Sequence, residues 1–85
     1  TGVPNDAEAV EAVARLFYDY LIRDLGLNRS DAKGAFYVIR NFLLSSGGKI
    51  TDESIEEFLN RFSGVTKRKY RYYLMLFRKF MGKAE

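Results

Sequence analysis

The residues best suited to do chemistry in this sequence are cations near its C-terminal end. Lys67, Arg71 and Arg78 are separated by 4, 7 and 11 residues, intervals that nearly complete whole helical turns at about 100° per residue. The predicted basic side of this helix comprises five cations and a tyrosine: Lys67, Arg68, Arg71, Arg78, Lys79 and Tyr72. Such side chains donate to phosphate oxygens, and arginine also reaches base edges. Taken alone, this pattern predicts only an anionic partner, and a solvated charged surface remains its alternative.

A second line of cations has the same spacing. Arg29, Lys33 and Arg40 are again 4, 7 and 11 residues apart, with Tyr37 and Asn41 beside them. Two basic lines on two helices could straddle a duplex, with Lys and Arg on phosphates and Asn or Arg at base edges. We therefore predict double-stranded DNA as the partner.

The charges are sorted along the chain. Residues 1–64 carry 7 basic and 10 acidic groups, whereas residues 65–85 carry 7 basic groups and one acidic group. This split predicts an anionic partner for one end of the molecule.

The residue types exclude most other functions. The chain has no histidine and no cysteine, which removes the commonest general base, the usual zinc ligands and disulfides. Four acids, Asp52, Glu53, Glu56 and Glu57, lack EF-hand spacing, and the adjacent Glu56 and Glu57 point about 100° apart on a helix. We predict no catalytic centre, metal, cofactor or small-molecule substrate. No apolar stretch approaches the roughly 20 residues of a membrane span, and we expect a cytoplasmic, prokaryotic, nucleoid-associated protein.

Hydrophobic periodicity predicts an all-α domain of four helices at about 6–25, 29–45, 52–62 and 66–81. Each expected start has a capping residue, and these are Asn5, Asn28 or Ser30, Thr51 and Thr66. A glycine follows each expected end, and these are Gly26, Gly47, Gly64 and Gly82. We expect residues 1–85 to form one compact bundle, excised from a longer protein.

Apolar residues at three- and four-residue spacing mark the face of each helix that should be buried. In the first two helices these are Val10, Val13, Ala14, Phe17, Tyr20, Leu21, Ala32, Ala35, Phe36, Ile39, Phe42 and Leu43. In the last two they are Ile55, Phe58, Leu59, Phe62, Tyr70, Tyr73, Leu74, Phe77, Phe80 and Met81. Gly34, inside the second helix, suggests a close contact with another helix.

Two segments carry a resemblance to a known family. Residues 50–59 read ITDESIEEFL, residues 66–70 read TKRKY, and Leu74, Phe77 and Phe80 follow. In order, these residues resemble the core-binding domain of tyrosine recombinases, the phage-integrase family, also called its SAM-like N-terminal domain. The resemblance implies one half of a clamp on DNA, with the second and fourth helices facing the duplex. It also implies a separate C-terminal catalytic domain and self-association on DNA through the first helix.

The alternative function is a helical protein–protein interaction module with a solvated basic face. Leu16, Tyr18 and Ile22 lie off the apolar stripe of the first helix. If exposed, they would dock a partner protein.

Overall fold

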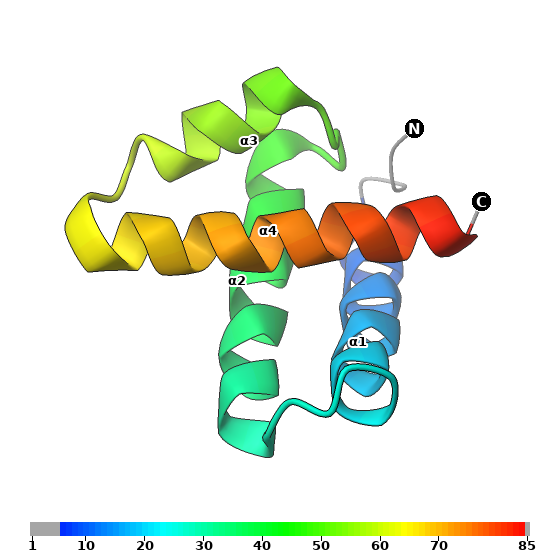
Figure 1. Cartoon of the computed structure of the whole chain (residues 1–85). Helices are drawn as coiled ribbons and strands as arrows, with labels where there is room; N and C mark the ends of the chain where they lie inside the picture. The colour runs from blue at the N-terminus through cyan, green and yellow to red at the C-terminus, as the bar shows by residue number, and fades with distance from the viewer. Residues whose placement is uncertain (1–5, 85) are drawn as a thin grey trace.

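The computed structural model describes residues 6–84, which form four α-helices and no strand (Figure 1). These are α1 (Ala7–Arg23), α2 (Arg29–Ser46), α3 (Asp52–Leu59) and α4 (Gly64–Ala84). Helices α1 and α2 run antiparallel side by side, and α4 crosses in front of both, with α3 leading into its start (Figure 1). The predicted all-α class is confirmed. None of the described helices is long and apolar enough to span a membrane.

The first three helices begin at side chains that cap backbone N–H groups. Asp6 caps α1 by accepting from the Ala9 N–H at 2.8 Å, so the expected cap, Asn5, which lies outside the described residues, is not the N-cap. Asn28 rather than Ser30 caps α2, accepting from the Asp31 N–H at 2.8 Å. Thr51 caps α3 as predicted.

The cap of α3 is reciprocal. The Ser54 N–H donates to Thr51 Oγ1 at 3.1 Å, and the Thr51 N–H donates to Ser54 Oγ at 3.0 Å. Two end-group donors are thereby satisfied, and the Ser54 hydroxyl also bonds the Lys49 carbonyl oxygen at 2.9 Å. The start of α3 is thus fixed to the segment that precedes it.

The predicted bounds of the last two helices were wrong. Helix α3 ends at Leu59 rather than 62, and α4 begins at Gly64, two residues before the expected cap Thr66. The chain turns at Gly64, whose φ is +60°, and the Lys67 N–H donates to the Ser63 carbonyl oxygen at 3.3 Å. Because this first turn closes on Ser63, Thr66 lies inside the helix.

Among the glycines expected at helix ends, Gly47 caps α2 as predicted, whereas α1 ends at Arg23 with Asp24 as its C-cap, before Gly26. Gly26 and Gly47 follow α1 and α2 with φ of +71° and +66°, although α1 itself ends at Arg23, before the predicted residue 25. Gly82 does not end α4, which continues to Ala84. A glycine within a helix costs about 1 kcal/mol relative to alanine, a cost small enough for the neighbouring turns to absorb.

Aromatic rings join the four helices. Phe17 of α1 meets Phe77 of α4 edge-on at 5.2 Å between ring centroids, and Phe42 of α2 meets Phe58 of α3 at 5.5 Å. Such pairs contribute about 0.5–1.5 kcal/mol beyond their area. The predicted stripes are confirmed except at one position: their members are buried or pack against the core, with Val13, Tyr20, Phe62, Tyr70, Phe80 and Met81 half-buried. Phe36 is half-buried against the Tyr18 and Tyr37 rings instead, and Val38, which was not predicted, is buried in the core.

Candidate nucleic-acid interface

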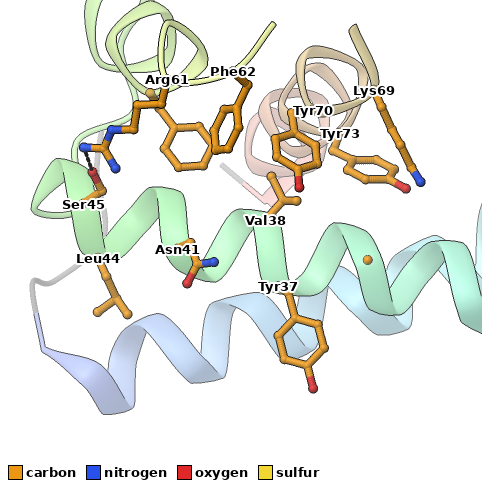
Figure 2. A pocket seen from close by; sticks show the side chains of 12 residues that line it. Tyr37, Val38, Asn41, Leu44, Ser45, Arg61, Phe62, Lys69, Tyr70 and Tyr73 are labelled. Carbon is orange, nitrogen blue, oxygen red and sulfur yellow. Dashed lines mark hydrogen bonds between the residues drawn. The ribbon is translucent and has the colours of Figure 1, made fainter. Parts of the chain in front are cut away.

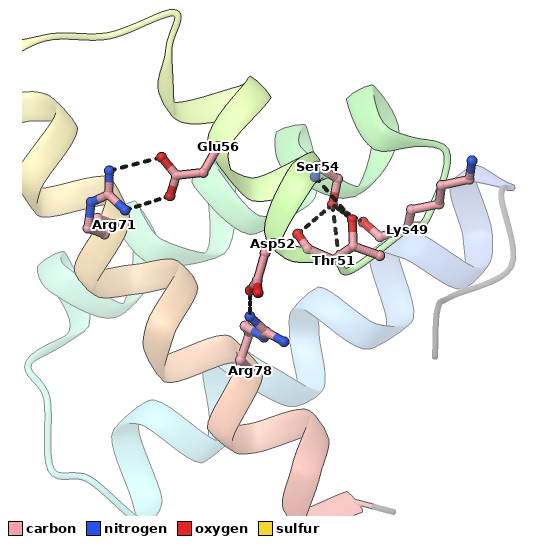
Figure 3. Close-up of polar contacts among 7 residues, drawn as sticks. All are labelled: Lys49, Thr51, Asp52, Ser54, Glu56, Arg71 and Arg78. Atoms are coloured by element: carbon pink, nitrogen blue, oxygen red, sulfur yellow. Dashed lines mark hydrogen bonds and ion pairs between the residues drawn. The ribbon is translucent and has the colours of Figure 1, made fainter.

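The predicted basic line on α4 lies against the acidic face of α3 (Figure 3). Arg71 donates from Nη1 to Glu56 Oε2 at 2.6 Å and from Nη2 to Oε1 at 3.2 Å, a bidentate pair. Arg78 donates from Nη1 to Asp52 Oδ1. Two of the three cations in the line are therefore already paired with carboxylates of the same chain.

The Arg71–Glu56 pair changes the titration of both groups. The hydrogen bonds from Arg71 hold the pKa of Glu56 below its ordinary value, with the positive charges of Arg71 and Lys67 acting in the same direction. The same hydrogen bonds raise the pKa of Arg71. Each partner thus stabilises the charged form of the other.

Lys67, the third member of the line, is also engaged. Its side chain is half-buried, and Nζ donates to Asn60 Oδ1, just beyond the end of α3, at 3.3 Å. The remaining hollow on this side of α4 is small, about 240 Å³, and both ion pairs line it. This side of α4, facing α3, is called the closed flank below.

The basic line on α2 lies at a different helix junction. Arg40 Nη1 is 3.5 Å from Glu11 Oε1 of α1, and the guanidinium carbon is 5.7 Å from the centroid of the Tyr37 ring. Arg40 Nε is buried and lacks a partner among the described residues. Lys33 lines a hollow beside Arg15 and Tyr18 of α1, and Arg29 is exposed at the start of α2.

The two predicted lines are consequently not adjacent parts of one surface. The α4 line is engaged at the junction with α3, and the Arg40 end of the α2 line is engaged at the junction with α1. The face opposite the core of α4 carries the remaining predicted residues of that helix, all exposed: Arg68, Tyr72 and Lys79. These form what is called here the outer face of α4.

The structure does bring two predicted α2 residues together with α4, in a groove on the other flank (Figure 2). Tyr37 and Asn41 line a cavity of about 810 Å³ between α2, the end of α3 and the first half of α4. Lys69 and Tyr70 line it from α4 and Arg61 from the turn after α3. This side of α4 is called the open flank.

Two cations of the open flank, Lys69 and Arg61, were absent from the predicted site. Lys69 Nζ lies 5.9 Å from the centroid of the Tyr73 ring. Arg61 donates from Nη2 to Ser45 Oγ at 2.6 Å, and its guanidinium carbon lies 5.7 Å from the Phe58 ring centroid. Neither forms an ion pair within residues 6–84. The helical spacing placed Lys69 off the basic line, and Arg61 was placed in a helix that ends before it.

The exposed apolar surface expected on α1 is smaller than its sequence indicated. Leu16 is 62% exposed, but Tyr18 and Ile22 pack against the core. Tyr18 meets the Phe36 ring edge-on at 6.3 Å between centroids.

The acids of the described chain form no group of three or more suited to hold a metal ion.

In comparisons with known proteins, no family model, no curated protein and no solved structure matches this chain. Its function must therefore be argued from its own surface.

Proposed function

We propose that this chain is a DNA-binding module that contacts duplex DNA through α4, with the exposed start of α2 as a second contact. The observation that carries the proposal is the distribution of charge on α4. Residues 64–84 include seven cations and no acid. Three of these cations, Arg68, Lys69 and Lys79, are exposed and outside any ion pair of the described chain.

The outer face has the composition of a phosphate-binding surface. Arg68 and Lys79 are 11 residues apart, close to three turns and about 16 Å along the helix. Tyr72, 48% exposed, lies between them and can add a hydroxyl donor to the phosphate contacts of the two cations. Arg29 and Lys33 of α2 are exposed and unpaired as well. Arg71 and Arg78, already paired with carboxylates of α3, are not among the proposed DNA contacts.

Salt dependence of duplex binding tests the proposal. Each neutralised phosphate contributes about −0.9 to the slope of log affinity against log salt, so the three free cations of α4 predict about −2.7. Arg29 and Lys33 of α2 bring it to about −4.5, and Arg71 and Arg78 would bring it to about −6.3 if they exchanged carboxylates for phosphates. A random-sequence duplex titrated at several salt concentrations gives this slope. Absence of binding at low salt, or binding indifferent to salt, would overturn the proposal.

The finer part of the proposal is that the module is the SAM-like core-binding domain of a tyrosine recombinase. It is supported by the resemblance of residues 50–59 and 66–70, which here form the capped start of α3 and the first turns of α4. This role predicts that the reading frame continues after Glu85 into a catalytic domain with an Arg-rich active site and a tyrosine nucleophile. A continuation without such a domain would contradict the recombinase role while leaving DNA binding untouched.

A further inference from the structure

The open flank of α4 is a groove with positive ends and an aromatic lining. At one end of the groove, Arg61 donates a hydrogen bond to Ser45 of α2. At the other end, Lys69 lies by Tyr73, whose hydroxyl faces Gly34 of α2. Gly34 and Ser45 are 11 residues apart, about 16 Å along the helix. No carboxylate is among the residues that line the groove. Its electrostatics therefore favour a ligand with negative charge at more than one point.

The groove is lined by five aromatic rings, with Val38 and Leu44 as its aliphatic members. Tyr37 is 45% exposed, and Phe62 and Tyr70 are half-buried and meet edge-on at 4.8 Å between centroids. Planar rings with accessible surface stack on planar ligands, and every nucleobase has such a face.

Polar groups in the groove are free to bind a ligand. Asn41 lines the groove from α2 (Figure 2), and its carboxamide makes no hydrogen bond within residues 6–84. A carboxamide presents two donors and a two-lone-pair acceptor, a set that matches the edge of a base. The hydroxyls of Tyr37 and Tyr70 likewise have no hydrogen-bond partner among the described residues.

We propose that this groove binds unpaired nucleotides, with one base against the Tyr70 ring, another against the Tyr37 ring, and phosphates at Lys69 and Arg61. Its volume of about 810 Å³ lies within the roughly 300–1,000 Å³ of ligand sites. Its length of about 16 Å is several times the roughly 3.4 Å rise per nucleotide of a stacked strand. Asn41 would hydrogen-bond the base edge. The groove shares Lys69 with the duplex contacts proposed for α4, but Tyr37, Tyr70 and Arg61 belong to the groove alone, so loss of strand binding and loss of duplex binding can be told apart.

The same nucleotide chemistry has two sources, a single-stranded nucleic acid and a free mononucleotide. We would therefore titrate the chain with a fluorescent ten-nucleotide thymidine strand, with thymidine monophosphate, and with a blunt duplex of matched length. Backbone amide shifts of residues 34–45 and 61–73 would locate each ligand. Much tighter binding of the strand assigns a single-stranded ligand, and equal affinity per site assigns the mononucleotide. Binding of the duplex alone would overturn the groove proposal and leave the proposed function standing.

Variants inside and outside the groove test whether the strand binds there. Tyr37→Leu is expected to weaken strand binding roughly five-fold or more, from the stacking contribution of one base. Leu16→Ala removes an exposed apolar side chain of α1 that does not line the groove and should leave strand binding within two-fold, about the scatter of such titrations. Lys69→Ala should make the salt slope for the strand shallower by about 0.7, whereas Lys49→Ala, an exposed lysine of another segment, should leave it unchanged.

Three results would overturn the proposal. One is absence of binding by both strand and mononucleotide. Another is an equal loss in Tyr37→Leu and Leu16→Ala. The third is binding of a poly-glutamate peptide as tight as that of the strand, which would assign the groove to an acidic protein segment. Thermal unfolding of each variant, compared with the parent chain, separates loss of ligand contacts from loss of fold.

Discussion

The two flanks of α4 carry similar cations in opposite situations. On the closed flank, Arg71 and Arg78 are held by Glu56 and Asp52, around a hollow of about 240 Å³. On the open flank, Lys69 and Arg61 face a groove of about 810 Å³ that no carboxylate lines. The difference arises from the neighbouring helix: the side of α3 that faces α4 is acidic, whereas the groove-facing side of α2 is neutral. Availability of a cation therefore depends on what packs beside it.

This comparison changes what the basic helix is expected to do. A charge-assisted, bidentate arginine–carboxylate pair is geometrically specific, yet an exposed pair contributes little to stability. We infer that the closed flank fixes the orientation of α3 on α4, while the outer face and the open flank remain for ligands.

The largest predicted effect is on stability, and it comes from the buried side of α4, which lies between its two flanks. Phe77 is fully buried and meets Phe17 edge-on. Phe77→Ala should lower the free energy of unfolding by about 3–5 kcal/mol, because a lost aromatic ring leaves a cavity. Denaturant unfolding followed by circular dichroism would measure this. A loss below about 1 kcal/mol would mean that the packing of α4 on the core does not depend on Phe77.

A smaller effect is expected where α4 leaves the turn after α3. Gly64 has a φ of +60°, and no atom would contact an added Cβ. Gly64→Ala should cost about 1–2 kcal/mol from backbone conformation alone. Gly82→Ala is the matched control, because Gly82 lies in open space inside the helix without a positive φ, and that change should stabilise the chain by up to about 1 kcal/mol. Equal effects of the two would contradict the bounds of α4.

Gly34 tests the open flank without removing a contact. A Cβ there would lie 3.5 Å from Tyr73 Oη, an ordinary contact distance. Gly34→Ala should therefore raise the free energy of unfolding by about 0.5–1 kcal/mol, the helix-interior difference between the two residues. A loss of stability would show that α2 and α4 approach more closely here than the structure has them.

The smallest effect concerns pH and the closed flank. The pKa of Glu56 is lowered in the folded chain, so its contribution to stability is fully present above the ordinary glutamate value of about 4.5. That contribution is lost as the pH falls through the lowered pKa. Glu56→Gln should flatten the acid side of the stability profile, whereas Glu57→Gln, which has no ion pair in the described chain, should not. Identical profiles for both variants would exclude the Arg71 contact as the cause.

Much of the fold was predictable from local patterns, and less of the site. Periodicity identified the buried stripes, such as Phe17, Phe42 and Phe77, because a helix that buries one face must repeat apolar residues along it. Glycine alone did not define helix ends: Gly64 turned the chain and Gly82 did not. The ion pairs Arg71–Glu56 and Arg78–Asp52 join residues 15 and 26 positions apart. Spacing along one helix cannot indicate which neighbour it will meet.

The same limit explains the groove. Tyr37, Asn41 and Lys69 come together only because α4 crosses α2, and Arg61 joins them because α3 ends early. From sequence, Asn41 and Tyr37 were grouped with the cations of α2; both line the groove, whereas Arg29, Lys33 and Arg40 do not. Their partners from the other elements required the crossing itself.

The central claim is that the outer face of α4 binds duplex DNA while the closed flank does not. The salt slope of duplex binding for two charge-matched double variants tests it most directly, since the slope counts neutralised phosphates. We predict that Arg68→Ala with Lys79→Ala makes the slope shallower by about 1.8, and that Arg71→Ala with Arg78→Ala leaves it unchanged. A shallower slope in the second variant and an unchanged one in the first would contradict the account.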